Sequence, residues 1–264
     1  MELRCPICGN ILYKEERSCR CENNHSFDVA RQGYVHLLPV QNKRSLNPGD
    51  TRQQVLARRE FLEGGFYAPI SEALNKLAEG CKGPVLDAGC GEGYYSSRLA
   101  KHLNAELVGV DISKEAVRCA AASYKNATWL CASAARLPVA DGSVGLITSL
   151  FAFTDAAEFH RVLKPGGRFI RVLAAPDHLP ELKKVIYDRV LHKEKEGMTD
   201  LPGFTLVKTV PVRFSFTVEG AQVQNLLSMT PHVYRISKAG ADRLRQTEKL
   251  TDTASCILGL YKAE

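Results

Sequence analysis

Three glycines at alternate positions follow a short apolar run, and this pattern constrains the fold more than any other feature of the chain. The run 85–94 reads VLDAGCGEGY, an apolar strand with an acidic residue near its end and then a tight loop. Its G-x-G-x-G spacing differs from the G-x-G-x-x-G loop that lays a dinucleotide's pyrophosphate on a helix N-terminus. The spacing fits a cofactor that has no phosphate and needs space for an aminoacyl tail, as S-adenosylmethionine does.

Acidic residues on either side of this loop are candidate cofactor ligands. Asp87, at the strand end, can receive the cofactor's ammonium group, while Gly89 and Gly91 let the backbone approach its methionine part. Asp111 ends the next apolar run, eighteen residues after Gly93, where a carboxylate can accept hydrogen bonds from both ribose hydroxyls. The alternative is a simple tight turn with Asp111 capping the next helix. Strand, loop, helix, strand and acid together favour the cofactor site.

Apolar strands alternate with helices from residue 84 onward, which predicts the fold class. Strands are expected at 85–87, 107–111, 127–131, 144–150 and 168–173, and helices at 94–103, 114–124 and 155–163. This alternation is typical of an α/β protein with a doubly wound, mainly parallel sheet. Such sheets bind ligands at the carboxyl ends of their strands, where Asp87 and Asp111 are expected.

Further helices and strands are expected on both sides of this region. Asp50 stands at the N-cap position of a helix that ends at Gly64-Gly65, and a second helix runs from Pro69 to about Gly80. After residue 179 we expect a helix to about His192, strands near 207–217 and 254–261, and a helix near 219–228. These elements enlarge the α/β region at both ends.

Cysteines near the N-terminus have the spacing of a zinc knuckle. Cys5 and Cys8 form a C-x2-C pair, and Cys21 and His25 supply a second half. Three thiolates and one imidazole would close a tetrahedral, structural zinc site. Cys19 is a competing ligand. Cys21 and His25, four residues apart, can bind one ion with less strain than Cys19 and Cys21, which a single residue separates. The alternative, reduced cysteines with a surface histidine, leaves a small coreless segment without anything to hold it.

Length and composition favour two unequal parts. A chain of 264 residues fits one large α/β domain with a small appendage, which we place at residues 47–264 and 1–46. The formal charge of +6 supports an anionic partner weakly. A membrane partner is not expected, because the chain lacks the roughly 18 consecutive apolar residues of a membrane span. An N-terminus without a basic start and apolar run predicts a cytoplasmic protein.

Residues 84–173 resemble the Rossmann-like class I methyltransferases. The glycine loop matches their first motif, and residues 137–143 (LPVADGS) and 163–167 (LKPGG) resemble later landmarks of that superfamily. Two positions depart from the pattern. Ser133 stands where an acidic residue often meets the adenine amine, and Gly145 replaces a usual aspartate. The adenine contacts are therefore less well defined than the ribose contacts.

Almost the whole chain resembles a narrower family, the bacterial 23S rRNA (guanine-N1)-methyltransferases of the RlmA type. The matching segments are 5–8, 21 with 25–28, 33–41, 43–45 with 48–50, 57–59 and 229–231. The resemblance implies a zinc module joined to a Rossmann-like domain, methylation of a guanine in a hairpin loop of 23S rRNA, and a homodimer. It also implies that Tyr67 and His178 line the cofactor together with Gly91 and Glu92.

The chemistry that this resemblance implies needs few protein groups. Guanine N1 would attack the sulfonium methyl in line, with no covalent enzyme intermediate, and a base or a contact at O6 would handle the N1 proton. The unranked candidates for this base are Asp155, His160 and His232, and the aromatic candidates to stack on the base are Phe151, Phe153 and Tyr234. The zinc module and Lys43-Arg44 would hold RNA phosphates. Alternative functions are a small-molecule methyltransferase and a non-catalytic RNA-binding factor.

Overall fold

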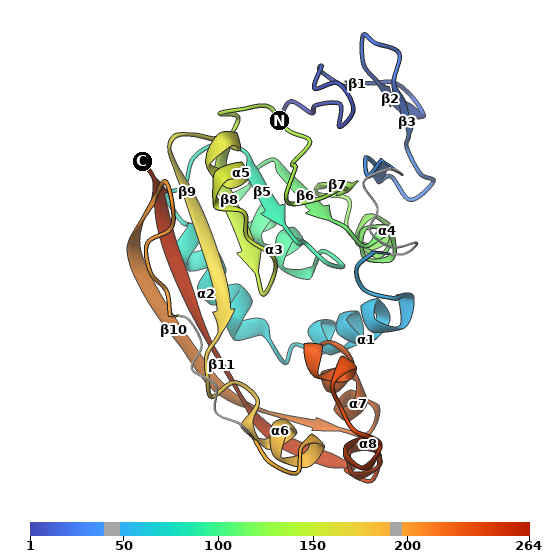
Figure 1. Ribbon diagram of the computed structural model, residues 1–264, viewed down its shortest axis with the longest axis vertical. Helices are drawn as coiled ribbons and strands as arrows, with labels where there is room; N and C mark the ends of the chain where they lie inside the picture. Colours follow the sequence, from blue (N-terminus) through green and yellow to red (C-terminus); the bar gives the residue numbers. More distant parts are fainter. Residues whose placement is uncertain (40–47, 191–196) are drawn as a thin grey trace.

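One eight-stranded sheet organises the chain, and its order is β10-β11-β9-β8-β5-β6-β7-β4 (Figure 1). The computed structural model describes residues 1–39, 48–190 and 197–264. The strands are β4 (Val35–His36), β5 (Val85–Ala88), β6 (Leu107–Asp111), β7 (Thr128–Cys131), β8 (Val144–Leu150), β9 (Leu163–Ala174), β10 (Phe204–Glu219) and β11 (Lys249–Ala263). The strands from β4 to β9 are parallel, whereas β11 is antiparallel to both β9 and β10. The predicted doubly wound, mainly parallel sheet is confirmed.

Both faces of the sheet are covered, which is why its central strands are apolar throughout. On one face, Val85, Leu107 and Leu146 pack under α2 (Ala68–Ala78) and α3 (Tyr94–Leu103). On the other face, Leu86 and Val108 pack with α5 (Ala156–Val162) and with apolar residues of the N-terminal segment. A further helix, α4 (Lys114–Ser123), packs near β6 and β7. Alternate residues of each strand therefore belong to two different cores.

The strand order reverses at β5, which pairs with β6 on one side and with β8 on the other. Connections leave the sheet in opposite directions at this point, so the carboxyl ends of the two neighbouring strands open a crevice between them. The glycine loop that follows β5 lies at this topological switch point. The tertiary fold thus puts the predicted cofactor loop where a sheet of this kind binds ligands.

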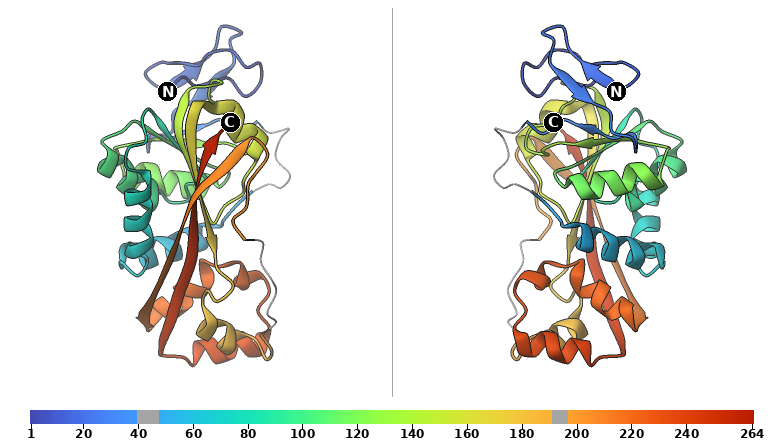
Figure 2. Two further views of the ribbon diagram at one scale, coloured as in Figure 1. Left: turned by 90° about the vertical axis from the view of Figure 1, so that its left-hand side faces the viewer. Right: turned by 90° about the vertical axis from the view of Figure 1, so that its right-hand side faces the viewer.

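The N-terminal segment is attached to the amino edge of the sheet, by which we mean the end where the parallel strands begin. The carboxyl edge is the end where they finish. Its small sheet comprises β1 (Tyr13–Lys14), β2 (Ser18–Arg20) and β3 (Ser26–Asp28). The Arg4 amide donates to the Pro138 carbonyl at 2.9 Å, and the Met1 amino group pairs with Glu106, directly before β6. After this module, β4 runs parallel to β7 and carries the chain to the carboxyl edge. The module stands at one end of the molecule in all three ribbon views (Figures 1 and 2).

The C-terminal helices lie at the opposite end, beyond the carboxyl edge (Figure 1). They are α6 (Pro180–Ile186), α7 (Ala221–Ser228), the 3-10 helix η2 (Pro231–Tyr234) and α8 (Lys238–Arg245). The long antiparallel strands β10 and β11 extend from these helices along the edge of the sheet, β10 preceding α7 and β11 following α8. Helix α1 (Arg52–Glu63) packs on α7, where Asn225 donates to Glu60 at 2.9 Å. Among the described residues, no helix is both long and apolar enough to cross a membrane.

Two local expectations are wrong, and one helix was not predicted. The N-cap of α1 is Thr51, which forms a capping box with Gln54, and not Asp50. The helix expected to reach His192 ends at Ile186, and His192 itself lies outside the described residues. The sequence analysis missed helix α8. This helix is joined to α6, where Arg243 donates to the Val185 carbonyl at 2.7 Å. The bounds predicted for α3, β6 and β8 are confirmed.

Candidate cofactor site and zinc centre

The loop after β5 has a backbone that excludes side chains. Gly89, Gly91 and Gly93 have φ angles of +87°, +56° and +90°, in the left-handed region that strongly favours glycine. A Cβ atom on Gly89 would lie 2.4 Å from the Cβ atom of Ala152, in the loop after β8. The loops after β5 and β8 therefore touch, and a side chain at position 89 would push them apart.

Asp111 is bound to the glycine loop through its carboxylate. Its Oδ2 accepts a hydrogen bond from the Gly91 amide at 2.9 Å, and its Oδ1 accepts one from the Ser113 amide at 2.8 Å. Each oxygen keeps a lone pair for another donor, as two ribose hydroxyls would require. The alternative role as a helix cap is wrong, because Ser113 caps α4 through the Ala116 amide. Burial raises the pKa of Asp111.

Asp87 lies deeper in the sheet than the other predicted ligands. It is 2% exposed, and it accepts hydrogen bonds from the Ser96 hydroxyl and, at 2.8 Å, from the Thr148 hydroxyl. Burial raises the pKa of this carboxyl group to about 6, against the opposing effect of the two hydrogen bonds. Asp87 thus joins α3 to β8 below the loop. Its contact with a cofactor ammonium group stays a prediction.

Arg58 faces the same acidic residues, and the sequence analysis gave it no role. Its guanidinium pairs with Asp50 and also interacts electrostatically with Glu92 and Asp111. Glu92 is 2% exposed, and burial raises its pKa to about 7 although Arg58 opposes this change. The backbone before α1 docks at the same place, because the Ser113 hydroxyl donates to the Asp50 carbonyl at 2.8 Å. Asp50 and Arg58 therefore lie over the edge where the cofactor is expected.

Tyr67 and His178, which are 111 residues apart, meet at the other side of this edge. The Tyr67 hydroxyl lies 3.4 Å from His178 Nε2, and His178 Nδ1 lies 2.9 Å from the Ser255 carbonyl oxygen. Tyr67 is buried, with its ring edge-on to Phe61. Burial raises the pKa of its hydroxyl far above the ordinary value. The fold thus joins two residues that the family resemblance alone had paired.

The three candidate bases are in different places. His160 lies at the amino edge, opposite the glycine loop, where its Nε2 is 3.2 Å from the Glu264 carbonyl oxygen at the end of β11. His232 lies among the C-terminal helices, with Nδ1 2.8 Å from the Tyr187 hydroxyl. Asp155 caps α5 by accepting from the Glu158 amide at 3.0 Å. Of the three, Asp155 lies nearest in sequence to the loop after β8.

The aromatic candidates for stacking are exposed, so core packing does not account for them. Phe151 is 42% exposed, Phe153 is 61% exposed and Tyr234 is 70% exposed. The Tyr234 hydroxyl accepts a hydrogen bond from Gln54 at 2.6 Å, which ties η2 to α1. The centroid of the Phe151 ring lies 6.2 Å from that of the His178 ring.

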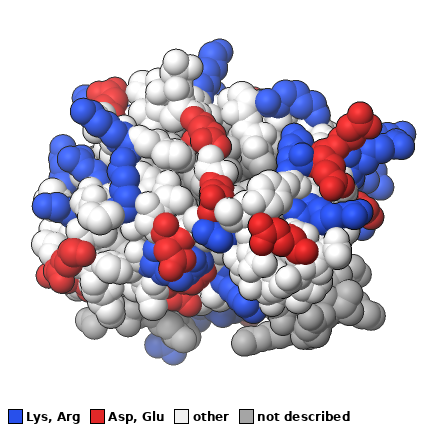
Figure 3. Space-filling model, turned by 90° about the horizontal axis from the view of Figure 1, so that it is seen from above, with Lys and Arg blue, Asp and Glu red and all other residues white. Residues whose placement is uncertain are grey.

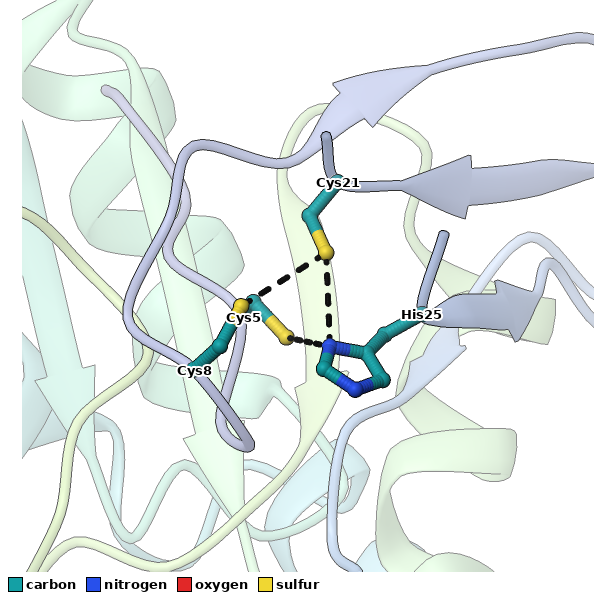
Figure 4. A group of neighbouring side chains, drawn as sticks. All are labelled: Cys5, Cys8, Cys21 and His25. Carbon is teal, nitrogen blue, oxygen red and sulfur yellow. Dashed lines mark hydrogen bonds between the residues drawn. The ribbon is translucent and has the colours of Figure 1, made fainter. Parts of the chain in front are cut away.

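The predicted zinc ligands converge in the N-terminal module (Figure 4). The ligand atoms of Cys5, Cys8, Cys21 and His25 all lie within 4.8 Å of one another. Cys5 Sγ and Cys21 Sγ are each 3.5 Å from His25 Nδ1, and Cys8 Sγ is 3.6 Å from Cys21 Sγ. Tetrahedral zinc needs ligand atoms about 3.5–3.8 Å apart, given metal bonds of about 2.3 Å to sulfur and about 2.0–2.1 Å to nitrogen. The four atoms fit this ion.

The surrounding backbone favours thiolates in this cluster. A hydrogen bond from the Asn10 amide is the main cause that lowers the pKa of Cys8 to about 6, against the opposing effect of burial. Cys19, the competing ligand, is buried on β2 in register with Phe27 and does not belong to the cluster. A tetrahedral set of four protein ligands leaves no open position, so the zinc is structural.

Comparison with known proteins assigns the chain to a family. Residues 3–46 match the model described as the zinc ribbon "RlmA, N-terminal", and residues 85–167 match the model described as "Methyltransferase domain". A 23S rRNA (guanine(748)-N(1))-methyltransferase of Streptomyces fradiae is 35% identical over 239 residues, which are 87% of this chain and 84% of that protein. The chain belongs to the 23S rRNA (guanine-N1)-methyltransferase family. S-adenosylmethionine and zinc, the two predicted cofactors, are thereby confirmed.

Other similarities separate the family from the wider methyltransferase fold. The YxjB protein of Bacillus subtilis, named as a candidate 23S rRNA (guanine-N1)-methyltransferase, is 28% identical over 97% of this chain and 96% of its own length. A malonyl-[acyl-carrier protein] O-methyltransferase of Hahella chejuensis is 35% identical, but over 41% of this chain and 43% of that protein. The solved structure of the Bacillus YcgJ protein has a TM-score of 0.47 and 19% identity, covering 74% of this chain and 97% of that one. Because the similarity to the O-methyltransferase covers less than half of each chain and that to YxjB covers nearly all of both, the small-molecule alternative is not favoured.

Proposed function

We propose that the chain transfers the methyl group of S-adenosylmethionine to N1 of a guanine in 23S rRNA. The observation that carries this proposal is the similarity to the Streptomyces enzyme, which spans 87% of the chain. A non-catalytic factor would not need the glycine loop, the carboxylate of Asp111 and the Tyr67–His178 contact to remain together at one edge of the sheet.

The chemistry needs orientation and the removal of one proton. S-adenosylmethionine supplies an electrophilic methyl group, which guanine N1 attacks in line while the bond from that methyl to sulfur breaks. In the proposed site, Asp87 receives the cofactor's ammonium group and Asp111 accepts from its ribose hydroxyls. The remaining proposed contacts come from Tyr67, Gly89, Gly91, Glu92 and His178. We propose Asp155 as the base that accepts the N1 proton, because of the three candidates it lies nearest in sequence to the loop after β8.

We propose residues 1–46 as a zinc-binding RNA-recognition module with its linker, and residues 47–264 as the methyltransferase domain. The described part of the module has five basic residues, Arg4, Lys14, Arg17, Arg20 and Arg31, and five acidic ones, Glu2, Glu15, Glu16, Glu22 and Asp28. Basic and acidic side chains are interspersed on the upper face (Figure 3). Because phosphate attraction depends on net positive charge, the described part of the module contributes shape recognition more than electrostatic attraction. Lys43 and Arg44 lie outside the described residues.

A hairpin in the RNA and a homodimer of the protein complete the proposal. The zinc module stands at the amino edge of the sheet and the glycine loop at the carboxyl edge, so the two are separated by the length of a strand. Seven residues of β8 span about 23 Å at about 3.3 Å per residue. An RNA hairpin that contacts both must extend along the sheet, or reach the module of a second copy. We propose the second arrangement, a dimer in which two chains share one RNA.

Methylation of purified 23S rRNA, mapped by primer extension, tests this function. A methyl group on N1 blocks the Watson–Crick edge, so reverse transcription stops next to the modified guanine. We expect one strong stop with 23S rRNA and none with 16S rRNA as the control substrate. Incorporation of methyl groups without a stop would place them on another atom and contradict the proposal. Ribosomal RNA from cells that lack the protein should show one lost guanine methylation by mass spectrometry.

A further inference from the structure

Phe151 has an unfavourable backbone conformation at the carboxyl end of β8. Its φ angle is +53°, in the left-handed region that bulky residues rarely adopt. The neighbouring chain holds it there, because the Phe151 amide donates to the Val172 carbonyl at 3.0 Å. The Ser149 hydroxyl also donates to the Phe153 carbonyl at 3.4 Å, which closes the turn. Glycine or asparagine would satisfy this turn with less strain.

The strained turn exposes an aromatic ring that could otherwise have been buried. All seven residues of β8 are buried, yet Phe151, the next residue, is 42% exposed. An exposed apolar ring gains little from the hydrophobic effect, and the strained backbone adds a further cost. Neither local conformation nor burial in the core favours a phenylalanine at this position, which makes a ligand contact the role to consider.

The position of the ring shows which ligand it can meet. Ala152, the next residue, faces Gly89 of the cofactor loop, where an added Cβ atom would lie 2.4 Å from its own. On its other side, the Phe151 ring is 6.2 Å from the His178 ring, with an angle of 33° between their planes. Phe151 thus lies at the rim of the proposed cofactor site, between the glycine loop and the Tyr67–His178 contact.

We propose that the target guanine stacks on the ring of Phe151 during methyl transfer, an inference that rests on the proposed function. RNA-binding proteins commonly hold unstacked bases on aromatic rings, and an enzyme that modifies a base must take it out of its stack. A flat ring fixes the plane of the stacked base but still allows the base to rotate within that plane. Because the strained turn positions the ring, it also sets how far this plane, and guanine N1 within it, lies from the methyl group.

Two other exposed aromatic residues are suitable for comparison. Phe153 is 61% exposed in the same turn, but its φ angle is not positive, and Tyr234 has its hydroxyl bound to Gln54. Neither shares the combination of strain, exposure and contact with the cofactor edge. The variant Phe153→Ala is therefore a matched control, since it removes an exposed ring from the same loop and leaves Phe151 in place.

The test compares Phe151→Gly, Phe151→Tyr and Phe153→Ala in the full-length protein. For Phe151→Gly we expect an equal or higher melting temperature, because glycine accepts the left-handed backbone, and S-adenosylmethionine affinity within about twofold of wild type by calorimetry. Its kcat/KM on 23S rRNA should fall by roughly ten- to a hundredfold, the range for loss of one base–aromatic stack. Phe151→Tyr should retain most activity, and Phe153→Ala should change it by less than about threefold.

The possible outcomes separate this inference from the proposed function. If wild type makes the primer-extension stop and Phe151→Gly makes it equally fast, the stacking role is wrong. If Phe151→Gly lowers both the melting temperature and the cofactor affinity, Phe151 is a structural residue. If wild type methylates no guanine N1, the proposed function fails, and the stacking role fails with it.

Discussion

The amide of Gly91 donates a hydrogen bond of 2.9 Å to the carboxylate of Asp111, which joins the glycine loop after β5 to the end of β6. This bond holds two adjacent strand ends in a fixed relation at the topological switch point. It also orients the carboxylate, because the second oxygen accepts from the Ser113 amide. A carboxylate fixed in this way binds a pair of hydroxyls without first losing rotational freedom, and this preorganisation favours affinity.

Replacement of Asp111 by Ala should weaken S-adenosylmethionine binding by roughly ten- to a hundredfold, because hydrogen bonds to a charged group contribute about 1.5–3 kcal/mol. Isothermal calorimetry measures the affinity directly. Ser113→Ala is the control for local structure, since it removes the cap of α4, at a cost of about 1 kcal/mol in stability, and the bond to the Asp50 carbonyl, but leaves the carboxylate and its two amide donors in place. Unchanged affinity in Asp111→Ala would refute the ribose contact.

Gly89→Ala should abolish cofactor binding and lower the melting temperature. The new methyl group would lie 2.4 Å from Ala152 and would also be strained at a φ angle of +87°. Gly142→Ala separates these two effects, because Gly142 has a φ angle of +59° but no atom within 4 Å of an added Cβ. We expect the control to lose about 1–2 kcal/mol from strain alone and to bind cofactor normally. Equal behaviour of the two variants would mean that the contact with Ala152 is unimportant.

Cofactor affinity should rise as the pH increases through about 7, because burial raises the pKa of Glu92 to about 7 and a cationic cofactor favours its ionised form. In the absence of ligand, pH has the opposite effect on the stability of the folded protein. The folded protein holds a proton on Glu92 between its ordinary pKa of 4.5 and about 7, so stability declines as the pH rises through this interval. Calorimetry and thermal melting at pH 6 and pH 8 measure the two trends.

Two variants test the assignment of this pH dependence to Glu92. Glu92→Gln should remove the part of the pH dependence of affinity centred near pH 7 and leave the part near pH 6 that comes from Asp87. The charged groups that act on Glu92 are Arg58 and Asp111, of which Arg58 lowers its pKa. Arg58→Met should therefore move the midpoint to higher pH. A midpoint that is the same in wild type and Arg58→Met would exclude Glu92 as the titrating group.

The zinc module should bind about one metal ion per chain, as its single set of four ligands implies. Metal analysis should find that Cys8→Ser and Cys21→Ser lose zinc, whereas Cys19→Ser, altered on neighbouring β2, retains it. Because the module lies at the amino edge, cofactor affinity should persist in the zinc-free variants while RNA methylation is lost. Zinc loss in Cys19→Ser, or a chain that contains no zinc, would contradict the ligand assignment.

The sequence by itself determined the features that depend on local spacing. The alternate glycines predicted the cofactor loop because left-handed turns depend on the absence of a side chain, and the apolar runs predicted β6 and β8 because buried parallel strands are apolar throughout. The C-x2-C pair with Cys21 and His25 predicted the zinc cluster, since a metal ion fixes which residue types must meet.

Only the tertiary structure decided which distant residues share a surface. Arg58 meets Glu92 and Asp111 because α1 docks over the edge of the sheet, a contact that no spacing in the chain encodes. His160 lies at the edge opposite the glycine loop because α5, which carries it, packs beside the end of β11, and Phe151 is exposed because the turn after β8 bends its backbone into a strained conformation. Local patterns specify conformation and metal chemistry, whereas the packing of whole elements specifies which side chains reach a ligand.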